Sequence, residues 1–223
     1  LNVEKIGFLK NLIMLIWKGS NGEVSKTEDR LIEQVITEYY EAYFVGFKGY
    51  SASQRDALHK KFLIETATQG SATDTNEEVE ARINKRIKEM EDRRKALKVK
   101  ELSFNSFYEY STQRIPYICN ENKIAGIDIS TYNYMLMDFY RGGSHERTLN
   151  ENLDSTLFDE TFIVFEIDTI KDDPLLFPLV TLIIMDVFIQ KMRIKKNRKV
   201  LVIEEAWKAV DSPMMAEYIK YLY

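Results

Sequence analysis

The sequence predicts an α/β protein in which helices dominate, with an α-helical part over residues 1–150 and a smaller α/β part over residues 151–223. Helical apolar spacing and capping patterns recur along the first part. In the second part, two runs of strand character flank an apolar helix: Thr161–Asp168 and Lys199–Glu204. Strand, helix and strand in this order predict a βαβ unit, whose right-handed crossover makes the two strands parallel.

The composition is that of an ordinary globular protein with a buried core. Of 223 residues, 45% are hydrophobic, and only 4 are proline and 9 glycine. Thirty-five acidic against 31 basic side chains give a net charge of -4, so nothing in the charge indicates nucleic acid as a direct partner. The single cysteine, Cys119, allows no internal disulfide and no zinc cluster, which favours a reducing compartment and therefore the cytoplasm.

The longest apolar stretches, Leu12–Trp17 and Leu175–Ile189, are too short to span a bilayer, so we expect no transmembrane segment and no signal peptide. The chain starts at Leu1 and stops at Tyr223 within a predicted helix. These ends suggest a piece excised from a longer protein.

The helical part begins with apolar residues at helical spacing from Glu4 to Trp17, and a glycine-rich stretch from Gly19 to Gly22 ends that helix. Ser25–Glu28 has the capping-box pattern and predicts a second helix through about Tyr43. The capping-box pattern recurs three times and predicts a helical subdomain in which several helices begin: at Ser51–Gln54, Thr75–Glu78 and Ser106–Glu109.

A densely charged helix is predicted between Glu77 and Glu101. Its apolar residues form one narrow stripe: Val79, Ile83, Ile87, Met90 and Leu97. Such a helix would pack by one edge and expose the rest to water.

The acidic pair Glu204-Glu205 comes directly after four apolar residues, Val200–Ile203, which is the pattern of a Walker B strand. A buried parallel strand delivers carboxylates to the edge where α/β sheets bind ligands. Glu204 would then hold Mg²⁺, usually through water, and Glu205 would orient or deprotonate the attacking water. A strand that merely ends in charged turn residues produces the same letters, so this alternative stays open.

The residues around the acidic pair resemble a known family. Leu201–Lys208, which reads Leu-Val-Ile-Glu-Glu-Ala-Trp-Lys, and Ser212–Leu222 resemble the Walker B region of TraG-type conjugation ATPases, the motors of bacterial type IV secretion. Three earlier stretches resemble that family in the same order: Phe104–Tyr110, Phe139–Gly143 and Phe162–Asp173. The resemblance covers residues 104–223 well and is looser over residues 1–103.

The resemblance implies a partial RecA-like P-loop NTPase sheet with a large helical insertion between the phosphate loop and Walker B. It also implies an ATP- and Mg²⁺-dependent motor for pilus assembly and substrate export, hexameric when intact. Such a motor would contact other secretion proteins at the cytoplasmic face of the bacterial inner membrane. None of the nine glycines belongs to a Gly-x-x-x-x-Gly-Lys-Ser/Thr loop, so we expect the chain alone to be inactive. Glu204 stands where most relatives have aspartate.

Two other functions remain possible from the sequence. In a non-enzymatic helical interaction module, Glu204-Glu205 would be only the end of a strand. In another RecA-like motor, such as a DNA translocase, the same acids would serve turnover that DNA stimulates. The presence of a phosphate loop encoded upstream of Leu1 would favour a motor over the module.

Other candidate residues have a structural and a functional interpretation. Asp168 would either cap the turn before Asp172-Asp173-Pro174 or point to the same edge as Glu204. His59 and His145 lack a second histidine at ligand spacing, which argues against a metal site. Arg141-Gly-Gly143 could form an anion-binding turn, but a loop that ends a helix is the favoured interpretation. Cys119 is interpreted as a packing residue.

Two clusters complete the candidates. A basic cluster lies where the second-part helix ends, and it would either touch phosphates or complement the helix dipole: Lys191, Arg193, Lys195, Lys196, Arg198 and Lys199. An aromatic run at helical spacing favours core or interface over base stacking: Tyr39, Tyr40, Tyr43, Phe44 and Phe47. A truncated sheet would also expose strand edges, so we expect the chain to self-associate.

Overall fold

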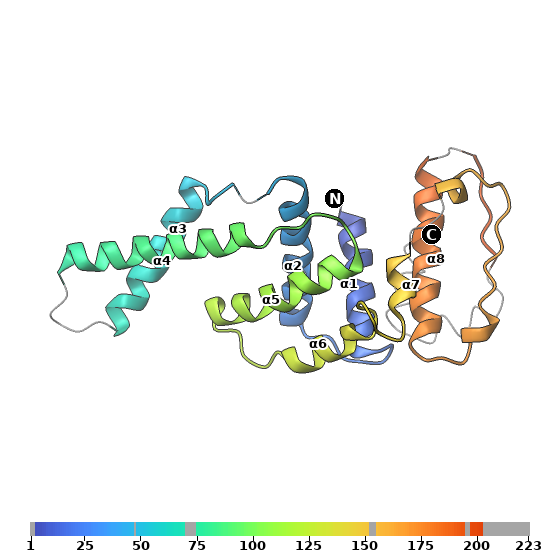
Figure 1. Ribbon diagram of the computed structural model, residues 1–223, viewed down its shortest axis with the longest axis horizontal. Coiled ribbons are helices and arrows are strands. Elements are labelled where there is room, and N and C mark those ends of the chain that lie inside the picture. The colour runs from blue at the N-terminus through green and yellow to red at the C-terminus, as the bar shows by residue number, and fades with distance from the viewer. Residues whose placement is uncertain (1–2, 47, 70–74, 152–154, 195–196, 203–223) are drawn as a thin grey trace. The chain divides into compact units, whose positions relative to one another are not determined.

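A computed structural model describes residues 3–46, 48–69, 75–151, 155–194 and 197–202. In these ranges the chain forms eight α-helices and two short 3-10 helices, and no described residue lies in a β-strand (Figure 1). The chain divides into two compact units. The first comprises Leu1–Thr37 and Ser103–Tyr223, and the second comprises Glu38–Leu102.

The first unit is built around α1 (Val3–Lys18), whose residues from Leu12 to Trp17 are all buried. A helix that is apolar on every side is stable only inside a core. Gly19 ends α1 in the left-handed region, at a φ of 73°. The next helix, α2 (Lys26–Phe44), begins in the first unit and ends in the second. Both helices were predicted from the sequence.

Three further helices belong to the first unit: α5 (Phe104–Asn122), α6 (Ile129–Met137) and α7 (Glu146–Asn150). The predicted capping box at Ser106–Glu109 is wrong. Ser103 caps α5 instead, because its backbone is extended and its side chain accepts a hydrogen bond from the Ser106 amide. Side chains from α5 and α6 and the turn after α6 fill the core between them: Phe104, Ile115, Ile118, Tyr132, Leu136 and Phe139.

The last described helix, α8 (Leu176–Ile194), agrees with the apolar helix predicted between the two runs of strand character. It packs against α1, where Lys5 Nζ lies 2.8 Å from an oxygen of the largely buried Asp186. Two 3-10 helices, η1 (Ser155–Phe158) and η2 (Asp168–Ile170), precede it. Among the described helices, none combines the length and apolar character needed to cross a membrane.

The predicted parallel sheet is not present in the described residues, so the α/β fold class is wrong for this part of the chain. Residues 162–167 and 198–202 have no regular secondary structure. Phe162 is 83% exposed and Val200 is 75% exposed, whereas a strand inside a sheet would bury such side chains. Strand residues need a hydrogen-bonded neighbour, and an alternating local pattern does not supply one. The predicted domain boundary at residue 150 stays a prediction.

The second unit contains the end of α2 together with α3 (Ala52–Gln69) and α4 (Asn76–Ala96), which pack on each other. The predicted stripe of α4 forms its buried edge at Ile83, Ile87 and Met90, while Val79 and Leu97 are half-buried. Arg86 lies over the ring of the buried Phe62, 4.0 Å from its centroid, and also pairs with Glu65 of α3 at 3.0 Å. The charged helix therefore packs by one edge, as its sequence predicted.

Candidate functional site

The predicted catalytic and metal-binding residues, Glu204 and Glu205, lie outside the described residues. The chain that leads to them, from Lys199 to Val202, has no regular secondary structure, and Val202 is 79% exposed. Across the described residues, no group of three or more His, Cys, Asp or Glu side chains could hold a metal ion. The roles of the acidic pair therefore stay predictions.

Asp168 opens the short helix η2, shortly before Asp172-Asp173-Pro174. Its carboxylate pairs with Lys171 Nζ at 2.8 Å, and its amide donates to Glu166 Oε1. Asp173 lies just before α8, and its Oδ1 accepts hydrogen bonds from the amides of Leu175 and Leu176 at 2.9 and 2.8 Å. The hydrogen bond from the Leu176 amide holds the pKa of Asp173 below its usual range.

The two histidines lie in different units. His59 of α3 pairs with Glu80 of α4 through Nε2 at 2.7 Å. His145 packs on the buried ring of Phe139, with 5.3 Å between ring centroids. Both contacts are structural, as the sequence interpretation expected.

The turn Arg141–Ser144 uses its own amides for internal hydrogen bonds. The Arg141 amide donates to Asn105 Oδ1 at 3.0 Å, and the Gly142 amide donates to Glu146 Oε2 at 2.9 Å. The Gly143 amide donates to the Tyr140 carbonyl at 2.8 Å. Since these three amides already have acceptors, the turn is a loop that ends a helix and not an open anion-binding nest.

Polar side chains and a close backbone approach fix this turn. The Asn150 side chain accepts from the Asn105 amide and donates to the carbonyls of Phe139 and Glu146, at 2.9–3.0 Å. A Cβ atom at Gly143 would lie 2.2 Å from the Asp138 carbonyl oxygen, so only glycine fits. The turn therefore has one well-defined conformation.

The described members of the basic cluster mostly bind their own chain. Lys191 Nζ donates to the carbonyls of Leu157 and Glu160, and Arg193 pairs with Glu4 of α1. Lys199 Nζ donates to the Asn197 carbonyl. Lys195 and Lys196 lie outside the described residues. These contacts favour the structural interpretation of Lys191 and Arg193 over phosphate binding.

The aromatic run passes from the core to the surface at the end of α2. Tyr39 is 3% exposed and meets Tyr40 edge to face, while Phe44 stacks on Tyr40 and is 64% exposed. Phe47 lies outside the described residues. The start of the run is core, and its end forms an exposed aromatic surface.

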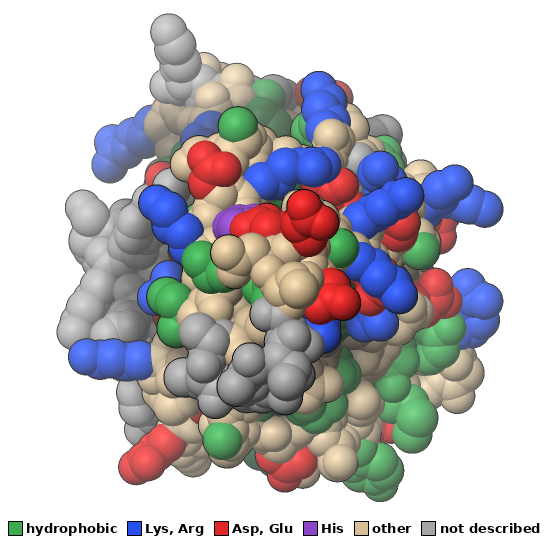
Figure 2. All heavy atoms as spheres, turned by 90° about the vertical axis from the view of Figure 1, so that its left-hand side faces the viewer, with side chains coloured by type: hydrophobic (Ala, Val, Ile, Leu, Met, Phe, Trp, Pro, Cys, Tyr) green, Lys and Arg blue, Asp and Glu red, His purple; other side chains and the backbone are tan. Residues whose placement is uncertain are grey.

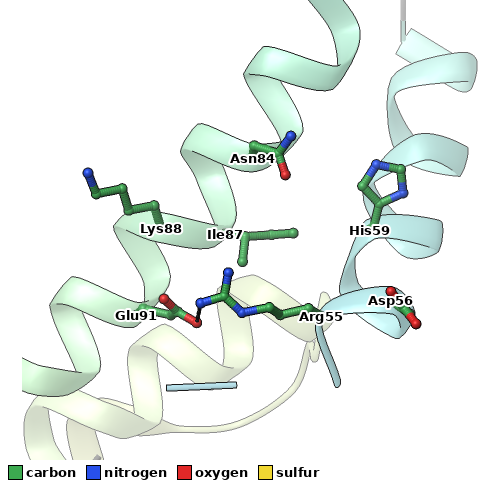
Figure 3. A pocket seen from close by; sticks show the side chains of 7 residues that line it. All are labelled: Arg55, Asp56, His59, Asn84, Ile87, Lys88 and Glu91. Carbon is green, nitrogen blue, oxygen red and sulfur yellow. Dashed lines mark hydrogen bonds and ion pairs between the residues drawn. The ribbon is translucent and has the colours of Figure 1, made fainter. Parts of the chain in front are cut away.

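A hollow of about 430 Å³ lies between α3 and α4 (Figure 3), and no sequence signal indicated it. Within it, Arg55 Nη2 reaches across to Glu91 Oε1 at 2.5 Å, and the same oxygen accepts from the Tyr50 amide at 3.1 Å. Its walls carry both charges: Arg55, Asp56, His59, Asn84, Ile87, Lys88 and Glu91. Figure 2 likewise shows acidic and basic side chains interspersed over one face of the molecule. This mixture favours no single class of ligand.

Cys119 is 7% exposed, and burial raises the pKa of its thiol. A buried thiol that resists ionisation is a poor nucleophile. The packing interpretation of Cys119 is therefore supported.

Comparison with known proteins gives a family match. A family model described as the TraG P-loop domain matches residues 43–223. No curated protein and no solved structure matches the chain.

Proposed function

The chain belongs to the TraG P-loop domain family, and on this premise we propose that the full-length protein is an ATP-hydrolysing motor of conjugative transfer and type IV secretion. Membership of the family makes it a conjugation-related P-loop protein. The observation that carries the finer proposal is the run Val200–Ile203 with Glu204-Glu205 directly after it, which lies inside the matched range.

The proposed chemistry assigns one role to each carboxylate. Carboxylate oxygens are the donors that Mg²⁺ prefers, so Glu204 suits the metal position of a phosphate-bound nucleotide. Glu205 would orient the water for in-line attack on the γ-phosphate of ATP and accept its proton. Mg²⁺, when bound, neutralises charge that develops on the phosphate oxygens.

The motor would act as several copies, a hexamer by resemblance, at the cytoplasmic face of the bacterial inner membrane. Its partners would be other proteins of the conjugation apparatus. The net charge of -4 does not favour direct binding of nucleic acid, so we do not propose nucleic acid as a partner.

Glu205→Gln in the full-length protein tests the proposal. We expect ATP binding, measured by calorimetry, to be retained, and steady-state turnover to fall about 100-fold, the range typical of a lost general base. Glu89→Gln is the matched control, because Glu89 is exposed on α4 and has no proposed role at the site, so turnover should stay unchanged. Undiminished turnover in Glu205→Gln would remove Glu205 from the mechanism.

The helical character of the described residues favours one alternative, a non-enzymatic interaction module. The same assay separates the two functions, since a module would show no ATP turnover even in the unmodified full-length protein. A DNA translocase would instead show turnover that added DNA increases.

A further inference from the structure

One surface of the first unit combines the exposed Tyr134, Met137 and Arg141 with the half-buried Tyr108 and Tyr140; we call it the tyrosine–arginine surface. Tyr134 is 70% exposed and Met137 is 49% exposed, three residues apart on α6. The rings of Tyr108 and Tyr140 stack beside them at 4.6 Å, and the Tyr108 hydroxyl donates to the Asn133 carbonyl. Arg141 completes the surface. Tyrosine, methionine and arginine are the residues enriched in protein interfaces.

The Arg141 guanidinium forms no ion pair with any described residue, although three carboxylates lie close to its turn. Each of these carboxylates accepts a hydrogen bond from another donor. Glu109 accepts from the Tyr140 hydroxyl at 2.7 Å, which raises the pKa of that phenol. Glu146 accepts from the Gly142 amide, and Asp138 accepts from the Ser144 hydroxyl at 3.2 Å. These three carboxylates therefore accept hydrogen bonds from neighbouring groups, and the Arg141 guanidinium is available to pair with a carboxylate of another chain.

The tyrosine–arginine surface is also held in place before any contact forms. The hydrogen bonds of the turn Arg141–Ser144 fix the backbone of Arg141, and the Tyr108 and Tyr140 hydroxyls are both hydrogen-bonded. A surface that is already ordered loses less conformational entropy on binding than a mobile one.

A second exposed surface lies at the end of α2 in the second unit; we call it the α2-end surface. It comprises Tyr43, Phe44 and Val45, which are 38%, 64% and 55% exposed, together with the exposed Glu41. The rings of Tyr43 and Phe44 meet edge to face at 4.9 Å. The Glu41 side chain forms no ion pair with a described residue. This surface therefore offers aromatic side chains and an available carboxylate.

We propose that the tyrosine–arginine surface of one copy binds the α2-end surface of a second copy, with Arg141 paired to Glu41. Charge complementarity supports this choice over self-pairing. Arg141 and Glu41 carry opposite charges, whereas a contact between two identical surfaces would bring two copies of the same charge into one interface. Across the proposed contact, opposite charges meet and aromatic side chains from both copies are buried together.

Because the two surfaces differ, the contact is head-to-tail, and such contacts build closed rings or open chains of copies. The inference deepens the proposed function and rests on it, since it names the contact between the copies of the motor. Its test does not depend on ATP turnover, so either proposal can fail alone.

Charge reversal in the full-length protein tests the contact. Arg141→Glu and Glu41→Arg should each weaken self-association at least about tenfold in sedimentation velocity, and the double variant should restore it to within about threefold of the unmodified protein. Lys85→Glu and Glu89→Arg are control variants, because both side chains are exposed on α4 and belong to neither surface. A monomeric unmodified protein, single reversals equal to their controls, or a double variant without recovery would each overturn the contact.

Cysteine crosslinking between copies provides a second test. Tyr134→Cys and Phe44→Cys proteins, mixed under oxidising conditions, should form a disulfide-linked dimer that neither protein forms alone. The native Cys119 is buried and should not contribute. Equal crosslinking in the mixed and unmixed samples would contradict a head-to-tail contact.

Discussion

Among single residues, Glu28 shows most clearly how one buried acid joins two helices. Its Oε1 lies 2.6 Å from Lys18 Nζ at the end of α1, and its Oε2 accepts from the Ser25 amide at 2.9 Å at the start of α2. Burial alone would raise the pKa of Glu28, but the hydrogen bonds from Lys18 and Ser25 outweigh it and hold the pKa below the ordinary 4.5. The ionised carboxylate is thus the form that the fold stabilises.

The lowered pKa of Glu28 predicts that part of the free energy of unfolding is lost at acidic pH. A carboxyl whose folded pKa lies below its unfolded pKa contributes fully above the unfolded value of about 4.5, and the contribution is lost as pH falls through the folded value. Glu28→Gln should therefore lower the melting temperature at pH 7, and the difference from the unmodified protein should shrink below about pH 4. Thermal unfolding from about pH 3 to pH 7 checks this, with the exposed Glu89→Gln as control. A pH-independent difference would contradict the assignment.

At the scale of elements, helix starts could be predicted because their signals are local. The reciprocal bonds of a capping box form at Ser25–Glu28, Ser51–Gln54 and Thr75–Glu78, as predicted. The predicted start at Ser106 was wrong because Ser103, three residues earlier, offers the same hydroxyl to the backbone. The sequence shows which side chains can cap, but neighbouring candidates compete.

The strands could not be predicted correctly, because their stability is not local. Phe162 and Val164 have the composition of a buried strand, yet they are 83% and 71% exposed. The same pattern becomes a strand only where another strand provides hydrogen bonds and apolar side chains cover it. The alternating sequence pattern therefore shows that these residues can form a strand, but it does not show that they do.

The pairing of α3 with α4 leads to a prediction at this scale. Glu91 is 6% exposed and binds both the Tyr50 amide and Arg55, so it ties the start of α3 and the connection before it to α4. Glu91→Ala would remove both hydrogen bonds, and a typical hydrogen bond contributes about 0.5–1.5 kcal/mol to stability. Hydrogen exchange of residues 50–55 should accelerate about tenfold or more.

Glu89→Ala is the matched control, since Glu89 lies on the same helix but faces solvent. Equal acceleration in both variants would mean that Glu91 stabilises only α4 itself.

For the whole molecule, the sequence predicted the chemistry of candidate residues better than their contacts. Lone histidines and a packing cysteine could be interpreted from their neighbours in the chain. Arg55 and Glu91, in contrast, are 36 residues apart, and Asn105 and Asn150 are 45 apart, so nothing in a single sequence pairs them. Long-range polar pairs need the fold to be known first.

The exposed segment before η2 predicts where proteases cut the chain first. Residues 162–167 lack regular structure, and Phe162 and Phe165 are 83% and 40% exposed. Chymotrypsin should therefore cleave after these residues before it cleaves at aromatic residues buried in helices, such as Phe107. Limited proteolysis with mass spectrometry of the fragments checks the order. Early cleavage at Phe107 instead would show that the helices open more readily than this segment.

The passage of α2 through both units constrains how the chain can change length. Residues 26–37 of this uninterrupted helix belong to one unit and residues 38–44 to the other. Each residue added to an α-helix rotates the downstream part of the chain by about 100° and advances it by about 1.5 Å. A single insertion or deletion near Thr37 would thus rotate the side chains of residues 38–44 by about 100° around the helix axis relative to those of residues 26–37. Gains or losses of about seven residues would nearly preserve the helical phase, so we expect length variation in this helix to come in heptads.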